Sequence, residues 1–385
     1  MFRKSYVFDD VLLVPKLTNA SSRKCIDISV NLNKIGRLSI PIISANTQWC
    51  TESKMAIAIA RMGGLGIIHR MCTIETQVSH VHAVKARAGS DFTHEKDFDP
   101  TLDKDGKLKV GASVGIVDDY FDRAIQLISS GVDFITVDVA HGHSTRALNA
   151  IKNLTHSFPE IPLIAGNVAT AQGVIELARA GASVIKVGIG PGSVCTTRLV
   201  TGAGVPQLTA IMDCVQAGKE LGVSIIADGG IKSSGDIVKA LAAGASCVML
   251  GRMIAGTNES AAELIEIEGK KYKATRGFVT FGTKLELRRL QGKKIPTEEY
   301  IRYVPEGVEA CFEYIGSLRE YLYQLIGGIQ SGFSYSGASN YQELISNHEF
   351  IQVSLQTQQE NLPHALNIYG TPPIDYNKEV VYSDD

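Results

Sequence analysis

One cysteine in a glycine-rich segment is the residue best placed for chemistry in this sequence. Cys195 ends the run 188–195, which contains three glycines, and two threonines and an arginine follow it. Glycines let the backbone turn sharply and approach a ligand closely, and successive amide groups in such a turn can bind an anion. A thiolate in a loop of this kind can act as a nucleophile. The segment therefore predicts a phosphate cradle beside a candidate covalent catalyst.

The bulk properties restrict the classes of partner. The 385-residue chain is 44% hydrophobic and 20% charged, which is ordinary for a soluble globular protein. Its net charge of −2 gives no electrostatic reason to expect nucleic acid or an anionic membrane as a partner. No apolar run is long enough to span a membrane, and the first residues lack the apolar core of a signal peptide. The seven cysteines show no C-x-x-C spacing, so we expect a reduced, cytoplasmic setting without a zinc site or disulfides.

Short apolar runs alternate with amphipathic patterns along most of the chain. Eight such runs predict an α/β fold, a parallel (β/α)8 TIM barrel, rather than an open sheet. The runs are apolar throughout, as expected when both faces of a strand are buried. The expected strands are 43–47, 64–68, 109–114, 134–140, 163–168, 184–190, 224–230 and 246–251. The expected helices are 53–61, 118–129, 145–156, 171–180, 208–221 and 234–243.

Polar residues gather where these runs end. Asp138, Asn167 and Asp228 stand there, as does the glycine and cysteine segment. In a TIM barrel the carboxyl ends of the strands converge on one mouth, so this pattern predicts a catalytic site there. Taken singly, Asp228 is either a helix cap or an acceptor for ribose hydroxyls, and Asn167 is either a turn residue or a ligand contact.

Three segments depart from the alternation within a predicted single catalytic domain, 1–358. Residues 86–107 are polar and predict an exposed insertion between the second and third strands. Residues 274–303 carry many charges and form either a flap over the mouth or a solvated excursion. Glu306 follows this flap in the sequence. It is either a turn residue or a general acid/base at the barrel mouth. The tail 359–385 is predicted to be partly disordered.

Several motifs in order resemble the IMP dehydrogenase/GMP reductase family. They are the segments 8–15, 138–144, 165–168, 188–207, 228–231 and 304–307. The resemblance extends from about residue 6 to about residue 355. It implies a (β/α)8 barrel, usually a homotetramer, that acts at C2 of a purine nucleotide.

The resemblance also implies roles for single residues. Cys195 would attack C2 to form a covalent thioimidate, while Thr197 and Glu306 would move protons beside it. Asp228 would bind the ribose hydroxyls. The implied ligands of the 5′-phosphate are Ser193, Gly230, Gly251 and Arg252. Asp138, Asn167 and Gly188 would lie on the nicotinamide side, and the carbonyls of Gly190, Gly192 and Cys195 match those that hold potassium in the dehydrogenases.

The two branches of this family differ in the fate of the intermediate. The reductase expels ammonia from GMP and takes hydride from NADPH to give IMP, whereas the dehydrogenase passes hydride from IMP to NAD and then hydrolyses the intermediate to XMP. Hydrolysis needs a base that activates water, and the dehydrogenases carry an Arg-Tyr pair midway along the flap. Here the only such pair, Arg302-Tyr303, directly precedes the 304–307 motif.

These differences lead to a GMP reductase as the first hypothesis. Asn46 and Gln48 resemble some reductases, and only about twenty polar residues, 86–107, stand where the dehydrogenases usually carry a paired regulatory domain. An NAD-dependent IMP dehydrogenase is the alternative, favoured by the length of the flap and by 200–207. A catalytically inactive nucleotide-binding regulator is the third hypothesis, because Thr47 and 278–281 depart from both branches.

Overall fold

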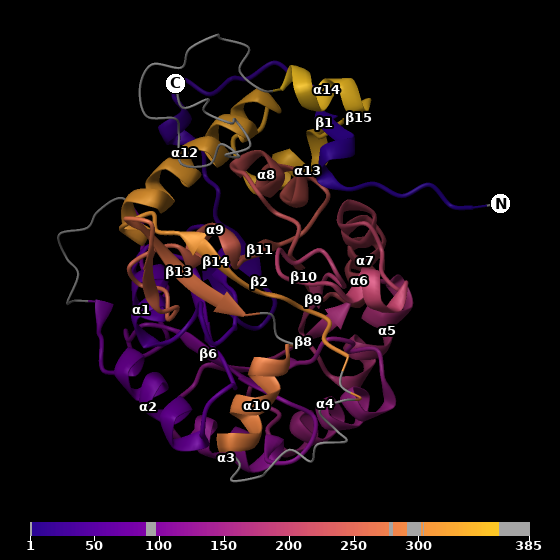
Figure 1. The fold of residues 1–385 in the computed structure, drawn as a ribbon. Coiled ribbons are helices and arrows are strands. Elements are labelled where there is room, and N and C mark those ends of the chain that lie inside the picture. The colour runs from indigo at the N-terminus through magenta and orange to yellow at the C-terminus, as the bar shows by residue number, and fades with distance from the viewer. Residues whose placement is uncertain (1, 90–97, 277–279, 291–301, 303, 362–385) are drawn as a thin grey trace.

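The eight expected strands close into one parallel barrel. The computed structural model describes residues 2–89, 98–276, 280–290, 302 and 304–361 (Figure 1). The strands pair in chain order, and the last returns to pair with the first. They are β4 (Ile42–Ser44), β5 (Leu65–Ile68), β6 (Val110–Val114), β7 (Phe134–Asp138), β8 (Leu163–Val168), β9 (Val184–Val187), β10 (Ser224–Asp228) and β11 (Cys247–Leu250). The predicted fold class is confirmed.

Helices surround the barrel and bury one apolar face each against it. They are α1 (Ser53–Arg61), α2 (Ile74–Lys85), α3 (Tyr120–Ser129), α4 (Thr145–Ser157), α5 (Ala171–Ala180), α7 (Gln207–Leu221) and α8 (Ser234–Ala242). Ser144, Thr170 and Ser233 begin three of them, because each side chain accepts a hydrogen bond from a backbone amide of the first turn. The eighth place is taken by α12 (Leu318–Tyr335), which packs on both α8 and α1.

Helix α2 was not among the expected helices. Its apolar and polar residues are poorly separated between the two faces, so its sequence shows little helical periodicity. Its buried face includes Gln77, whose amide donates to the carbonyl of Ser113 and whose oxygen accepts from Arg123. The helix is thus positioned partly by long-range polar contacts that periodicity does not reveal.

Several strands end earlier than predicted. β9 ends at Val187 and β10 at Asp228, because the glycines that follow leave the extended conformation. Gly188 has φ +152° and Gly229 has φ +92°, values that side-chain-bearing residues rarely adopt. The residues predicted to extend these strands therefore form turns at the barrel mouth.

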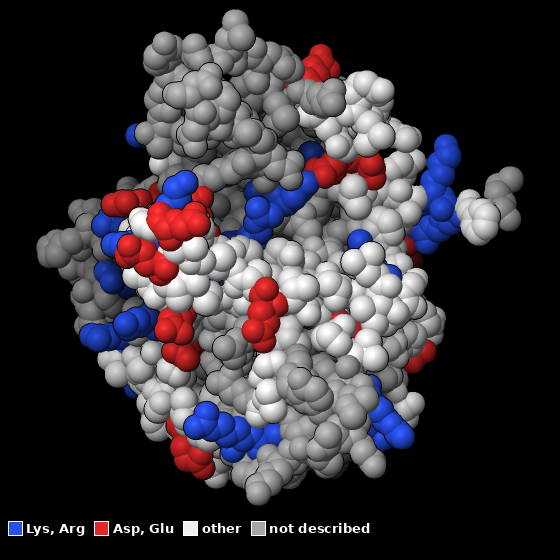
Figure 2. Space-filling view, viewed as in Figure 1, with Lys and Arg blue, Asp and Glu red and all other residues white. Residues whose placement is uncertain are grey.

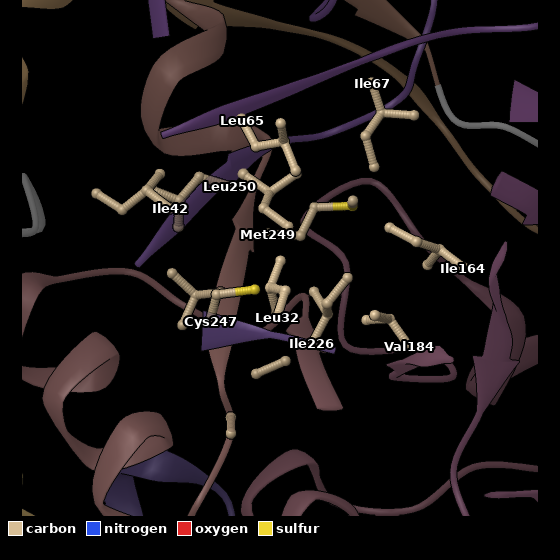
Figure 3. Packing of buried hydrophobic residues seen from close by; sticks show 14 of the residues in the cluster. Leu32, Ile42, Leu65, Ile67, Ile164, Val184, Ile226, Cys247, Met249 and Leu250 are labelled. Atoms are coloured by element: carbon tan, nitrogen blue, oxygen red, sulfur yellow. The ribbon is translucent and has the colours of Figure 1, made fainter. Parts of the chain in front are cut away.

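The amino-terminal end of the barrel is closed. A hairpin of β2 (Val30–Leu32) and β3 (Gly36–Leu38) lies across it, and Figure 3 shows Leu32 beside Ile226 and Cys247. The backbone amide of Asn33 donates to the hydroxyl of Ser224, the first residue of β10. Among the described residues, the opposite end, where the strands finish, is the one that carries a pocket for a ligand.

A glycine on β6 is required by packing rather than by backbone conformation. A Cβ added at Gly111 would lie 2.1 Å from the ring of Phe134 on β7. We expect Gly111→Ala to lower the free energy of unfolding by about 1–3 kcal/mol, because the close-packed core must move to admit a methyl group. Gly327→Ala is the matched control, since that helical glycine has open space around it, and it should be neutral or stabilising. Thermal denaturation of both variants checks this, and equal melting temperatures would contradict it.

The two polar segments, 86–107 and 274–303, differ in structure from what the sequence predicted. Residues 86–107 lie between β5 and β6 as expected, but Thr101 is buried and its amide donates to the carbonyl of Ala60. The predicted flap begins inside a strand, because Ala274 already belongs to β13 (Lys270–Arg276). That strand forms a sheet with β12 (Leu264–Ile267) and β14 (Glu309–Glu313), over which acidic and basic side chains lie close together (Figure 2). Most of the tail prediction falls outside the described residues.

Smaller elements complete the described structure. β1 (Val11–Leu13) pairs with β15 (Phe350–Gln352), which brings together two segments far apart in the sequence. The remaining elements are η1 (Phe8–Asp10), η2 (Arg23–Cys25), α6 (Thr197–Thr201), α9 (Arg252–Ala255), α10 (Phe281–Leu290), α13 (Tyr341–Asn347) and α14 (Leu355–Glu360). None of the helices in the described ranges has the length and apolar character that crossing a bilayer requires.

Candidate active site

A pocket of about 340 Å³ opens at the carboxyl ends of the barrel strands. Its size lies within the range of small-molecule sites. Every residue predicted from the sequence to act in catalysis or ligand binding lies on its lining: Asp138, Asn167, Gly188, Gly190, Gly192, Ser193, Cys195, Thr197, Asp228, Gly230, Gly251, Arg252 and Glu306. The structure brings these residues together, and their individual roles remain predictions.

The glycine segment after β9 can pass close to β10 only without a side chain. A Cβ at Gly188 would lie 1.9 Å from the carbonyl oxygen of Asp228. Arg198 packs against this segment, and its guanidinium donates to the carbonyls of Ile189 and Val205. These contacts fix the position of the segment at the barrel mouth, and Cys195 on it lines the pocket.

Cys195 lies beside a hydroxyl and pairs with Gly307, in the segment that leads into β14. Its Sγ is 3.1 Å from Oγ1 of Thr197, and the Thr196 amide donates to the Glu306 carbonyl at 2.8 Å. Val308 donates in turn to the carbonyl of Val194. This short antiparallel pairing brings Glu306, which lies far along the chain, to the edge of the pocket beside the cysteine.

Three of the other cysteines are unsuited to a nucleophilic role. Burial raises the pKa of Cys50 and of Cys214 to about 12, and it raises the pKa of Cys72 to about 11. These thiols stay protonated near neutral pH, and the thiolate is the nucleophilic form. None of the three lines the pocket, whereas Cys195 is partly exposed there.

A buried polar cluster forms the floor of the pocket. Asn167 Nδ2 donates to Oδ2 of Asp228 at 2.8 Å and to the carbonyl of Gly188 at 2.9 Å. Lys186 Nζ donates to Oδ1 of Asp138 at 2.6 Å and to Oδ2 of Asp228 at 3.2 Å. Burial alone would raise the pKa of Asp138, but Lys186 outweighs it and the pKa lies below its usual value. Both carboxylates are therefore preorganised in a site that excludes much of the solvent.

Lys186 also lines the pocket, although it was not among the predicted site residues. The available signal was a lysine inside the otherwise apolar β9, since a buried lysine needs a charged partner. Which partner it takes depends on the neighbouring strands, and these cannot be identified from one strand alone.

The opposite side of the pocket has the character of a phosphate site. Gly230 has φ +79°, and Gly251 and Arg252 lie at the start of α9. A Cβ at Gly229 would lie 3.0 Å from Pro191, so the turn after β10 packs directly on the glycine segment. Two turns with little side-chain bulk thus leave backbone amides able to face an anion.

Comparisons with known proteins agree with this geometry. A family model described as "IMP dehydrogenase / GMP reductase domain" matches residues 5–364. The chain is 38% identical to the inosine-5′-monophosphate dehydrogenase of Borreliella burgdorferi, over 94% of this chain and 98% of that one. It is 35% identical to the corresponding protein of Nitrosopumilus maritimus, over 95% and 99%.

A solved structure is similar over nearly the same length. It is a GMP reductase variant from Trypanosoma brucei in complex with guanosine 5′-monophosphate. The TM-score is 0.87 at 30% sequence identity, and the match covers 95% of this chain and 99% of that chain. The similarity therefore extends over the whole barrel and the segments that surround its mouth.

Proposed function

Because the chain belongs to the IMP dehydrogenase/GMP reductase family of nicotinamide-dependent oxidoreductases of purine metabolism, we propose that it is an NADPH-dependent GMP reductase. The observation that carries this choice is the acid/base equipment near Cys195. Glu306 lies on the pocket beside it, while the segment 274–303 has no Arg-Tyr pair at its middle to activate water. A carboxyl group can deliver the proton with which ammonia leaves, whereas hydrolysis of the intermediate also needs a base that activates water.

Asn46 provides independent support for the reductase. Its side chain is buried, donates to Ser113 Oγ at 2.8 Å, and lines the pocket. The residue that resembles the reductases is thus part of the pocket floor rather than a surface feature. The purine would lie above it.

In the proposed reaction, Cys195 Sγ forms a bond to C2 of GMP. The exocyclic C2–N bond then breaks, and Glu306 acting with Thr197 delivers the proton with which ammonia leaves. Bound NADPH would supply the hydride that C2 accepts. The S–C2 bond finally breaks, which returns the thiolate and releases IMP. Thr197 is within hydrogen-bond reach of the sulfur, as such proton transfers require.

The pocket residues differ in how freely they could contact GMP and the nicotinamide cofactor. Asp228 retains acceptor capacity for the ribose hydroxyls of GMP, and Ser193, Gly230, Gly251 and Arg252 would surround its phosphate. On the proposed nicotinamide side, Asp138 and Asn167 already bind Lys186 and Asp228. They would therefore shape that side through their positions and remaining lone pairs.

We also propose that the carbonyls of Gly190, Gly192 and Cys195 would hold a potassium ion. They lie on one turn, and carbonyl oxygens are the ligands that replace the hydration shell of potassium in proteins. The carbonyl of Gly192 also accepts a hydrogen bond from the Cys195 amide at 3.0 Å, which leaves one lone pair for a cation. A bound ion would steady the turn that carries Cys195.

We further propose a homotetramer, which light scattering would test.

IMP dehydrogenase is the second candidate, and the names of the curated relatives favour it. Purified protein should be supplied with GMP and NADPH, or with IMP and NAD, while the absorbance of the reduced nicotinamide is followed. We expect oxidation of NADPH with IMP as the product. Formation of NADH from IMP, with XMP as the product, would instead identify a dehydrogenase.

A further inference from the structure

Lys186 occupies a position where a barrel normally places an apolar side chain. Val184, two residues earlier on β9, lies beside Ile226 inside the barrel (Figure 3), and alternate residues of a strand share one face. Lys186 therefore points inward one layer nearer the mouth, and it is only 2% exposed. Burial of an unpaired ammonium group is strongly unfavourable, so this residue must have compensating contacts.

The contacts of Lys186 come from three other strands. Its Nζ reaches Asp138 at the end of β7, Asp228 at the end of β10, and Asn46 Oδ1 just after β4 at 3.4 Å. Gly166 on β8 leaves room for it, because a Cβ there would lie 2.6 Å from Cβ of Lys186. One buried cation is thus shared by two carboxylates that line the pocket.

We propose that Lys186 is the positioning residue of the nucleotide site, and that it holds the carboxylate of Asp228 oriented to accept the ribose hydroxyls while it compensates the neighbouring charge of Asp138. This inference rests on the proposed binding of a nucleotide by Asp228, but it holds for GMP and IMP alike. It assigns Lys186 no contact with the reacting atoms.

The charges around the cluster make the inference specific. Burial alone would lower the pKa of Lys186, but Asp138 and Asp228 outweigh it and raise the pKa, so the ammonium persists at neutral pH. Arg70, which lies after β5, is the other positive group that acts on Asp138. Without Lys186, two neighbouring carboxylates would share the pocket, and like charges favour retention of a proton by one of them.

The test replaces Lys186 by methionine, which has a similar length and no charge. Calorimetry should measure the dissociation constants of GMP and IMP at about pH 6.5 and about pH 9, relative to wild type at the same pH. We expect binding about tenfold or more weaker at the lower pH, where the two carboxylates would share one proton between them. At the higher pH the loss should shrink to about threefold, as the proton dissociates.

Lys85→Met is the matched control. Lys85 also bridges two carboxylates, those of Asp103 and Asp133, but Asp133 precedes β7 and so lies at the closed end of the barrel. This variant should lower the melting temperature yet bind both nucleotides like wild type at each pH. The double variant Lys186→Met/Asp138→Asn removes the competing carboxylate, so it should bind without the added pH dependence, and it provides the test if the single variant does not fold.

Nucleotide binding by Lys186→Met that matches wild type at both pH values would overturn the inference. A loss of the same size at both pH values would also overturn it, since that indicates only structural damage. These measurements need no turnover. Failure of the proposed reductase activity would appear separately, in the assay of the wild-type protein with GMP and NADPH.

Discussion

Cys195→Ala should reduce turnover by about 10⁴-fold or more, because loss of the nucleophile removes the covalent route itself. The thiol is partly exposed on the pocket and its Sγ lies 3.1 Å from the hydroxyl of Thr197. The dissociation constant of GMP should change by no more than about tenfold, or about 1.4 kcal/mol. The phosphate and ribose contacts proposed for Gly230 and Asp228 do not involve the sulfur.

The measurement combines steady-state kinetics, calorimetry with GMP, and mass spectrometry of acid-quenched enzyme. Wild-type protein should show a nucleotide adduct on the peptide that contains Cys195, and the variant should show none. Cys25→Ala is the control, because that thiol is exposed but does not line the pocket, and it should retain full activity. Substantial turnover by Cys195→Ala would refute covalent catalysis at this residue.

Glu306→Gln should lower kcat by about 10²- to 10⁴-fold, the range expected when a general acid/base is removed. The substitution keeps the size of the side chain but removes its ability to transfer a proton. The contact that positions residue 306, from the amide of Thr196 to the backbone carbonyl, does not depend on the side chain. The dissociation constant of GMP should therefore stay close to that of wild type.

The loss should appear in kcat with little change in the melting temperature. Glu309→Gln is the matched control, since Glu309 begins β14 three residues later and is exposed. It should behave like wild type. If Glu306→Gln retained most of its activity, the proton transfer would have to come from another group, and the residue would be a turn residue only. This variant does not distinguish reductase from dehydrogenase, because both need proton transfer at this place.

Much of the barrel could be predicted from local pattern. Apolar runs bounded by glycine and polar residues identified all eight strands, because a strand buried on both faces must be apolar along its length. The strand ends were less certain, since the positive φ of Gly188 and Gly229 depends on the close approach of two neighbouring turns. Helix α2 and the sheet of β12 to β14 were not predicted, because long-range pairing rather than periodicity determines them.

Many residues of the pocket could be identified from the sequence, because a parallel barrel must bring them together. Cys195, Asn167 and Asp228 each follow or end a strand, and closure of the barrel leaves them only one common mouth. Local spacing and the rules of strand connection were sufficient for that inference.

Which of these groups are in contact follows from the three-dimensional structure alone. It placed Glu306 beside Cys195 through pairing of two segments far apart in the chain, and it gave Lys186 two carboxylate partners from β7 and β10. The physical reason is that the free energy of a buried charge depends on its neighbours in space. A lysine within an apolar strand reports that partners must exist, and the closed barrel determines which residues they are.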